Sequence, residues 1–133
     1  MASIRKEITL SVGPEAVWDV VRDVGAVATR FAPGFVVDVA MEPGARIVTF
    51  ANGLVAREVI VDLDEAARRL AYSVRSERLE HHNASFQVLA GDGGGSRLVW
   101  TADLLPDAAK PNVEAMMADG MVAAKRALDD LAA

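Results

Sequence analysis

Apolar and polar residues alternate at the start of the chain. From Ile4 to Val12 the even positions are mostly apolar and the odd positions polar, and this period of two predicts a strand. Gly13-Pro14-Glu15 follows, where a proline at the first helical position and an acid in the first turn indicate the start of a helix. Apolar residues at helical spacing continue to Gly25, and a second short helix is expected from Ala26 to Phe31.

The middle of the chain predicts six short strands separated by turns. Residues that favour turns interrupt the pattern at Glu42-Pro43-Gly44, at Ala51-Asn52-Gly53 and in the glycine-rich stretch 91–95. Short strands at this close spacing indicate antiparallel neighbours. The expected strands are Phe35 to Met41, Arg46 to Phe50, Leu54 to Asp62, Arg69 to Arg75, Asn83 to Ala90 and Arg97 to Leu104.

The last part of the chain predicts one long helix. It would open at Pro106-Asp107 and run to about Leu131, and about 25 helical residues span roughly 37 Å. One face repeats apolar residues every three or four positions, and a row of mostly small residues beside it permits close approach of other elements. The apolar face is Val113, Met117, Met121, Ala124, Leu128 and Leu131, and the neighbouring row is Met116, Gly120, Ala123 and Ala127.

The order of elements predicts the fold class. One strand, two short helices, six strands and a long helix indicate an α+β protein with its helices on one face of an antiparallel sheet. We expect a seven-stranded curved sheet around the C-terminal helix, with space for a pocket between them. The length suits a single domain over residues 1–133.

Composition narrows the classes of function. A net charge of −5 argues against nucleic acid as a partner, because phosphates are met by a basic face. The chain has no cysteine, which excludes disulfides and thiolate metal sites. No apolar run reaches the roughly 18 residues of a membrane span, and no signal peptide is recognised. We therefore expect a soluble cytoplasmic protein, and the sequence leaves a homodimer open.

Several short motifs carry a family resemblance over the whole chain. They are Ile8-Thr9-Leu10, the segment Pro14 to Asp19, the stretch Gly44 to Asp64, Tyr72-Ser73-Val74, and Leu98-Val99-Trp100 ahead of Pro106. In this order they resemble the SRPBCC, or START-like, superfamily, and most of all its small bacterial polyketide cyclase/dehydrase-like group. The resemblance implies a helix-grip fold that binds a small, mostly apolar, lipid- or polyketide-like ligand in an internal cavity, as a carrier or sensor.

The resemblance also leaves an enzyme open, because this fold hosts carriers, receptors, cyclases and hydrolases alike. The alternative is a cyclase or dehydratase that uses the same pocket, without a cofactor and without a metal. Two segments occupy the places of mobile loops in the plant hormone receptors of the superfamily: Ala51 to Leu54 at the gate and Ser76 to Glu80 at the latch. The receptors' pocket lysine has no equivalent, since Phe35-Val36-Val37 stands there.

Arg46 and Glu58 are the most informative polar residues. If residues 51–53 form a three-residue hairpin loop with Gly53 in the left-handed conformation, Arg46 lies opposite Glu58 on the concave face. A two-residue loop would shift the register by one and break this pairing. An inward pair would be ion-paired, because either charge alone is costly in an apolar pocket. The alternative is that both are surface charges.

His82 and Tyr72 are the other polar candidates. By the resemblance, His82 falls at an inward pocket position, where in an enzyme it could act as a general base with Glu58 or Tyr72. The alternative is a histidine in water at the edge of a loop. Its neighbour His81 points to the opposite face, so the two do not chelate one metal ion. Tyr72 is either a pocket wall residue or a core aromatic.

The apolar wall completes the expected site. Trp100 is either wall or core, and Met117 and Met121 are expected at the pocket floor, with ordinary core packing as the alternative. The expected catalytic residues, in case of an enzyme, are His82, Glu58 and Tyr72. The full expected ligand-binding set is Arg46, Val48, Phe50, Glu58, Tyr72, His82, Phe86, Trp100, Met117 and Met121.

Overall fold

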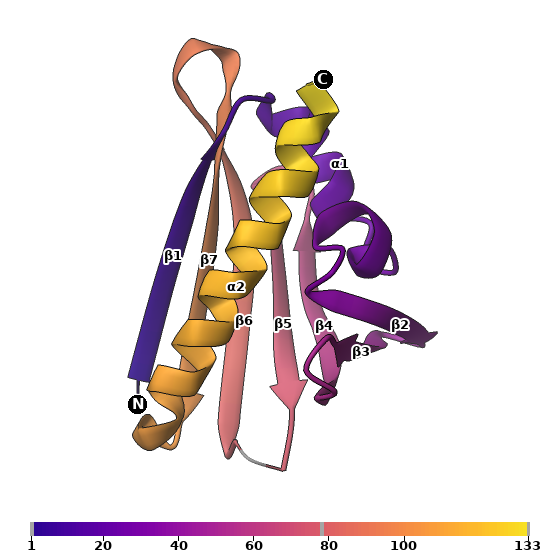
Figure 1. Ribbon diagram of the computed structural model, residues 1–133, viewed down its shortest axis with the longest axis vertical. Helices are drawn as coiled ribbons and strands as arrows, with labels where there is room; N and C mark the ends of the chain where they lie inside the picture. The colour runs from indigo at the N-terminus through magenta and orange to yellow at the C-terminus, as the bar shows by residue number, and fades with distance from the viewer. Residues whose placement is uncertain (1, 78, 133) are drawn as a thin grey trace.

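The computed structural model describes residues 2–77 and 79–132, which form one curved antiparallel sheet with helices against one face (Figure 1). Strands β2 to β7 each pair with the next strand in the sequence, and β1 pairs with β7 at the edge of the sheet. The strand order is therefore β1-β7-β6-β5-β4-β3-β2. The strands are β1 (Ala2–Leu10), β2 (Val36–Glu42), β3 (Ala45–Phe50), β4 (Val55–Asp64), β5 (Arg69–Arg75), β6 (His81–Ala90) and β7 (Ser96–Leu105).

Two helices and several short turns accompany the sheet. Helix α1 (Pro14–Val21) begins with its proline at the first position, as the sequence predicts, and a π-helical turn, η1 (Val27–Phe31), follows it. Helix α2 (Lys110–Asp129) lies between two 3₁₀ turns, η3 (Asp107–Ala109) and η4 (Asp130–Ala132), and η2 (Asp92–Gly94) is the turn of the β6–β7 hairpin. None of the helices in the described part of the chain is long and apolar enough to cross a membrane.

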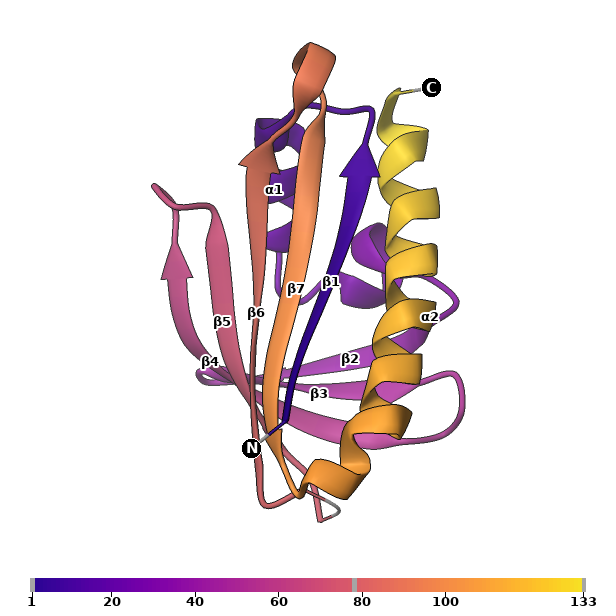
Figure 2. The same ribbon diagram turned by 90° about the vertical axis from the view of Figure 1, so that its left-hand side faces the viewer.

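The sheet bends around α2. In Figure 2 the strands β2 and β3 run across the direction of β1, β6 and β7, and α2 stands on the concave side of the bend. At 1.5 Å per residue, the 20 residues of α2 span about 30 Å, so the helix passes diagonally over most of the sheet in Figure 1. This is the helix-grip α+β fold that the sequence predicts.

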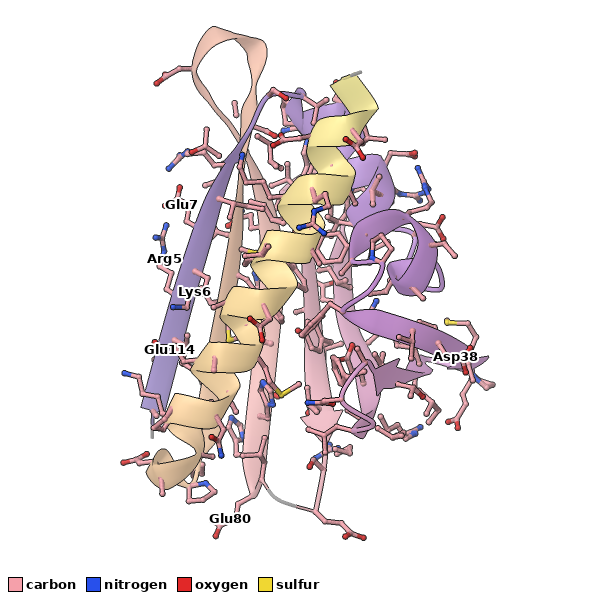
Figure 3. All side chains as sticks on the ribbon, in the orientation of Figure 1. Arg5, Lys6, Glu7, Asp38, Glu80 and Glu114 are labelled. Carbon is pink, nitrogen blue, oxygen red and sulfur yellow. The ribbon has the colours of Figure 1, made fainter. Side chains whose placement is uncertain are left out.

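The C-terminal half of α2 carries its tightest packing. Ala124 and Leu128 are fully buried, in one core with residues of α1 and of the central strands such as Val17 and Leu98. Nearer its start, α2 approaches β1 through Glu114, whose Oε2 lies 3.9 Å from Nζ of Lys6 (Figure 3). The core therefore fills one end of the space between the helix and the sheet.

Several strand boundaries differ from the prediction by one or two residues, and those of β1 and of the long helix differ most. Strand β1 runs from Ala2 to Leu10 rather than from Ile4 to Val12, although Ile4 and Leu10 point inward as expected. Beyond it, the backbone N–H of Ser11 donates to Asp129 Oδ1 at 3.3 Å, and the carbonyl of Val12 accepts from Ser96 Oγ at 2.8 Å. The side chains of Asp129 and Ser96 thus form hydrogen bonds with backbone groups that, in a longer strand, would pair with the neighbouring strand. The long helix begins at Lys110, after the turn η3, rather than at Pro106-Asp107.

Candidate ligand-binding site

A pocket of about 710 Å³ lies between the N-terminal half of α2, the turn η1 and the concave face of β3 to β7. Its size falls within the roughly 300–1,000 Å³ of typical small-molecule sites. Most side chains on its wall are apolar or aromatic, and a few polar ones are set among them. The pocket lies at the end of the space between α2 and the sheet that the core side chains do not fill.

All but one of the expected site residues line this pocket. Met121 is 4% exposed and belongs to the core rather than to the pocket wall, while Met116 lines the pocket although it was not expected to. Along α2 the lining residues end at Gly120, directly before Met121. The expected residues that line it are Arg46, Val48, Phe50, Glu58, Tyr72, His82, Phe86, Trp100 and Met117.

The register of the β3–β4 hairpin brings Arg46 opposite Glu58. The backbone N–H of Phe50 donates to the carbonyl of Leu54 at 2.8 Å, which closes a three-residue loop, and Gly53 has a φ of 89°. Only glycine adopts that left-handed conformation without steric cost. Of the two loop lengths that the sequence leaves open, the structure has the three-residue loop, and with it the pairing of Arg46 with Glu58.

Arg46 and Glu58 form a buried ion pair inside the pocket wall. Nε of Arg46 donates to Oε1 of Glu58 at 2.8 Å, and the two residues are 3% and 7% exposed. Nη1 of Arg46 also donates to the carbonyl of Val24 at 3.0 Å, and its guanidinium carbon lies 5.5 Å from the ring centre of Tyr72. The alternative of two surface charges is therefore wrong. The pair is held in place from three sides and is electrically neutral as a unit.

Aromatic rings build the part of the wall that adjoins this ion pair. Phe86 stacks on Trp100 with centroids 4.6 Å apart and on Tyr72 at 6.1 Å. Nε1 of Trp100 donates a hydrogen bond to Oη of Tyr72 at 2.9 Å. Burial, and to a lesser degree the negative charge of Glu58, raises the pKa of Tyr72, so its hydroxyl keeps its proton at neutral pH. Tyr72 and Trp100 both line the pocket, and Tyr72 is at the same time part of the buried core.

His82 lines the pocket from β6, where it lies opposite Leu104 of β7. Burial lowers its pKa, and the neighbouring His81 lowers it further. The imidazole is therefore neutral at pH 7. Its Nδ1 is buried and has no hydrogen-bond partner among the described residues. The structure thus agrees with an inward histidine and not with one in open water.

The segments compared with the gate and the latch lie at the pocket mouth. Leu54 contributes from the first, and Ser76, Glu77 and Leu79 from the second. Arg78 of the second segment lies outside the described residues. Glu80, which follows it, is at the end of the molecule far from the C-terminus (Figure 3). Both segments lie where the resemblance places the gate and the latch. That they open and close remains a prediction.

Sequence reasoning missed Phe35 and Gly120 as site residues. Phe35 lines the pocket and packs edge-on against Phe50 with centroids 5.3 Å apart. A Cβ at Gly120 would lie only 2.9 Å from Cζ3 of Trp100 and 3.0 Å from Cε2 of Phe35. The missing side chain lets both rings reach α2 and close the pocket there. The row of small residues on the helix was the available signal.

A curved antiparallel sheet that holds a long helix, with a pocket between them, defines a helix-grip protein. The chain belongs to the family described as polyketide cyclase/dehydrase and lipid transport, whose family model matches residues 1–133. A comparison with curated proteins gives no match.

Solved structures share the whole fold at low identity. Protein XoxI from Bacillus cereus is 18% identical with a TM-score of 0.88, and the match covers 100% of this chain and 99% of that one. A protein from Thermobifida fusca is 24% identical with a TM-score of 0.78, over 97% and 91% of the two chains. A protein from Bacillus thuringiensis is 15% identical with a TM-score of 0.84, over 96% and 98%. At these identities the likeness shows the fold alone.

Proposed function

We propose that residues 1–133 form one domain that binds a small, mostly apolar, lipid- or polyketide-like molecule in this pocket, as a carrier or sensor. The observation that carries the proposal is the pocket itself, about 710 Å³ with a largely apolar and aromatic wall. Few, well-placed polar groups on such a wall are typical of small-molecule sites. The family description, which includes lipid transport, supports it.

The hydrogen bonds of two of the three candidate catalytic residues favour a binding function over an enzymatic one. Oε1 of Glu58 is held by Arg46, and the hydroxyl oxygen of Tyr72 is held by Trp100. A general base needs a free lone pair within reach of the proton that it removes. Glu58 is fixed in position by Arg46 through Oε1, and Tyr72 keeps its proton at neutral pH, so both side chains are better suited to orienting a ligand than to removing a proton.

The binding function is tested with N-phenyl-1-naphthylamine, an uncharged dye whose fluorescence increases in apolar surroundings. We expect saturable binding of one dye per chain. Val113→Trp places a large ring in the pocket and should weaken binding at least tenfold. Val122→Trp is the matched control, since Val122 is on the same helix, is 61% exposed and does not line the pocket. Equal affinities of the two variants, or no saturable binding by the wild type, would contradict the proposal.

His82 supports a second candidate, a cyclase or dehydratase acting in the same pocket. A neutral imidazole with an unpartnered nitrogen can take a proton from a bound substrate. The test is to incubate a synthetic linear poly-β-ketone with the wild type and with the His82→Gln variant, and to follow the cyclised products by mass spectrometry. An enzyme would accelerate cyclisation and lose this effect in the variant. Rates equal to the spontaneous reaction in both samples would rule the candidate out.

A further inference from the structure

The hydrogen bond between Trp100 and Tyr72 fixes how the Tyr72 hydroxyl can meet a ligand. An indole N–H is only a donor, whereas a phenol hydroxyl can both donate and accept. Because Nε1 of Trp100 donates to Oη of Tyr72 at 2.9 Å, the oxygen serves as acceptor on the side of the indole. The hydroxyl hydrogen has no acceptor among the described residues. Tyr72 therefore has a donor left to offer to the pocket.

The charges on the pocket wall cancel. Arg46 and Glu58 are paired at 2.8 Å, with side chains 4% and 9% exposed, so neither offers an uncompensated charge to a ligand. His82 is neutral because its surroundings lower its pKa. Arg75 and Glu77, one of each sign, are exposed at the mouth. A carboxylate that entered the pocket would lose its water without gaining a cation of its own, and such burial is costly.

From these two features we infer that the pocket selects uncharged molecules that carry a carbonyl or ether oxygen, which accepts a hydrogen bond from Tyr72. This inference rests on the proposed function and deepens it, because it names the polarity of the ligand. Such a ligand satisfies the buried hydroxyl, and a hydroxyl left without a partner is unfavourable. A hydrocarbon of the same shape leaves Tyr72 unsatisfied, and the corresponding acid brings an unpaired charge.

Three anthracene probes of matched shape test the inference by fluorescence titration: 2-acetylanthracene, 2-ethylanthracene and anthracene-2-carboxylate. We expect Tyr72→Phe to weaken binding of the ketone about threefold to tenfold, the range for one neutral hydrogen bond. The same substitution should change the affinity for the hydrocarbon by less than about twofold. The carboxylate should bind the wild type at least tenfold more weakly than the ketone does.

A second measurement needs no variant. In the infrared spectrum of the wild-type complex, the carbonyl stretch of bound 2-acetylanthracene should lie below its position in cyclohexane, because the oxygen accepts a hydrogen bond. An unshifted carbonyl, or an equal loss of ketone and hydrocarbon binding in Tyr72→Phe, would overturn the part played by Tyr72. A carboxylate that binds as tightly as the ketone would overturn the selection against charge. Binding of the hydrocarbon tests the pocket alone, so the absence of all binding would overturn the proposed function as well.

Discussion

The buried pair of Arg46 and Glu58 predicts an unusual order of stabilities. Glu58→Leu leaves the Arg46 guanidinium unpaired at a site that is 3% exposed, and breaking a buried pair in this way costs about 3–5 kcal/mol of the free energy of unfolding. Arg46→Met leaves Glu58 unpaired at a similar cost. It also removes the donor to the part-buried Val24 carbonyl, and the loss of this hydrogen bond adds at most about 1–3 kcal/mol.

The double variant Arg46→Met/Glu58→Leu removes both charges together. Its remaining deficit is the Val24 carbonyl, about 1–3 kcal/mol, because apolar side chains of similar volume replace a buried pair at little cost. The double variant should therefore be more stable than either single variant. Equilibrium unfolding in urea, followed by far-ultraviolet circular dichroism, measures the three free energies, provided that the slope with urea is unchanged.

An exposed pair on the same sheet provides the control. Arg57 Nε lies 3.1 Å from Glu42 Oε2, with the two side chains 44% and 43% exposed. The same cycle there should give a coupling below about 1 kcal/mol, as for exposed ion pairs in general. If the double variant of the buried pair proves less stable than both singles, so that the losses simply add, the two charges are not coupled and the reasoning fails.

Two further predictions concern His82 and Gly120. Because the pKa of His82 is lowered from about 6.5 in the folded protein, the unfolded chain binds the extra proton first, and stability should fall as the pH drops below about 6.5. His82→Gln should reduce this slope between pH 7 and 5 in urea unfolding, and parallel slopes would contradict it. Gly120→Ala would normally stabilise a helix interior by about 1 kcal/mol, but here its Cβ would press on Trp100 and Phe35. We therefore expect Gly120→Ala to give no increase in stability and to bind N-phenyl-1-naphthylamine at least threefold more weakly. An increase in stability of about 1 kcal/mol with unchanged dye binding would show that the added Cβ does not meet these rings.

Local patterns were sufficient for most of the fold. Alternation and turn residues located all the strands, whereas the length of the β3–β4 loop, and with it the pairing of Arg46 with Glu58, stayed open. The boundary of β1 could not be predicted, because Ser11 and Val12 continue the alternation. Their backbone groups instead bond to Asp129 and Ser96, which are far away in sequence. A hydrogen bond over such a separation leaves no trace in the local pattern.

The extent of the site depended on packing that the sequence does not reveal. Met117 and Met121 share one face of the predicted helix, and nothing in the periodicity separates them. Where the pocket ends along α2 is set by the approach of Trp100 and Phe35 to Gly120, and these residues come from three distant segments. The pairing of Arg46 with Glu58 follows from one of the two loop lengths considered, whereas the extent of the pocket depends on packing between segments that are distant in the sequence.

Helix α2 is buried more deeply in its C-terminal half than at its start. Its buried residues begin at Met117, and the turns before it, which include Asn112 and Val113, lie over the pocket with their side chains exposed or half-buried. Segments with few buried contacts open locally at a small fraction of the free energy of global unfolding. We therefore expect the first turns of α2 to open at a lower free energy than the sheet, which would give a ligand a route into the pocket on that side.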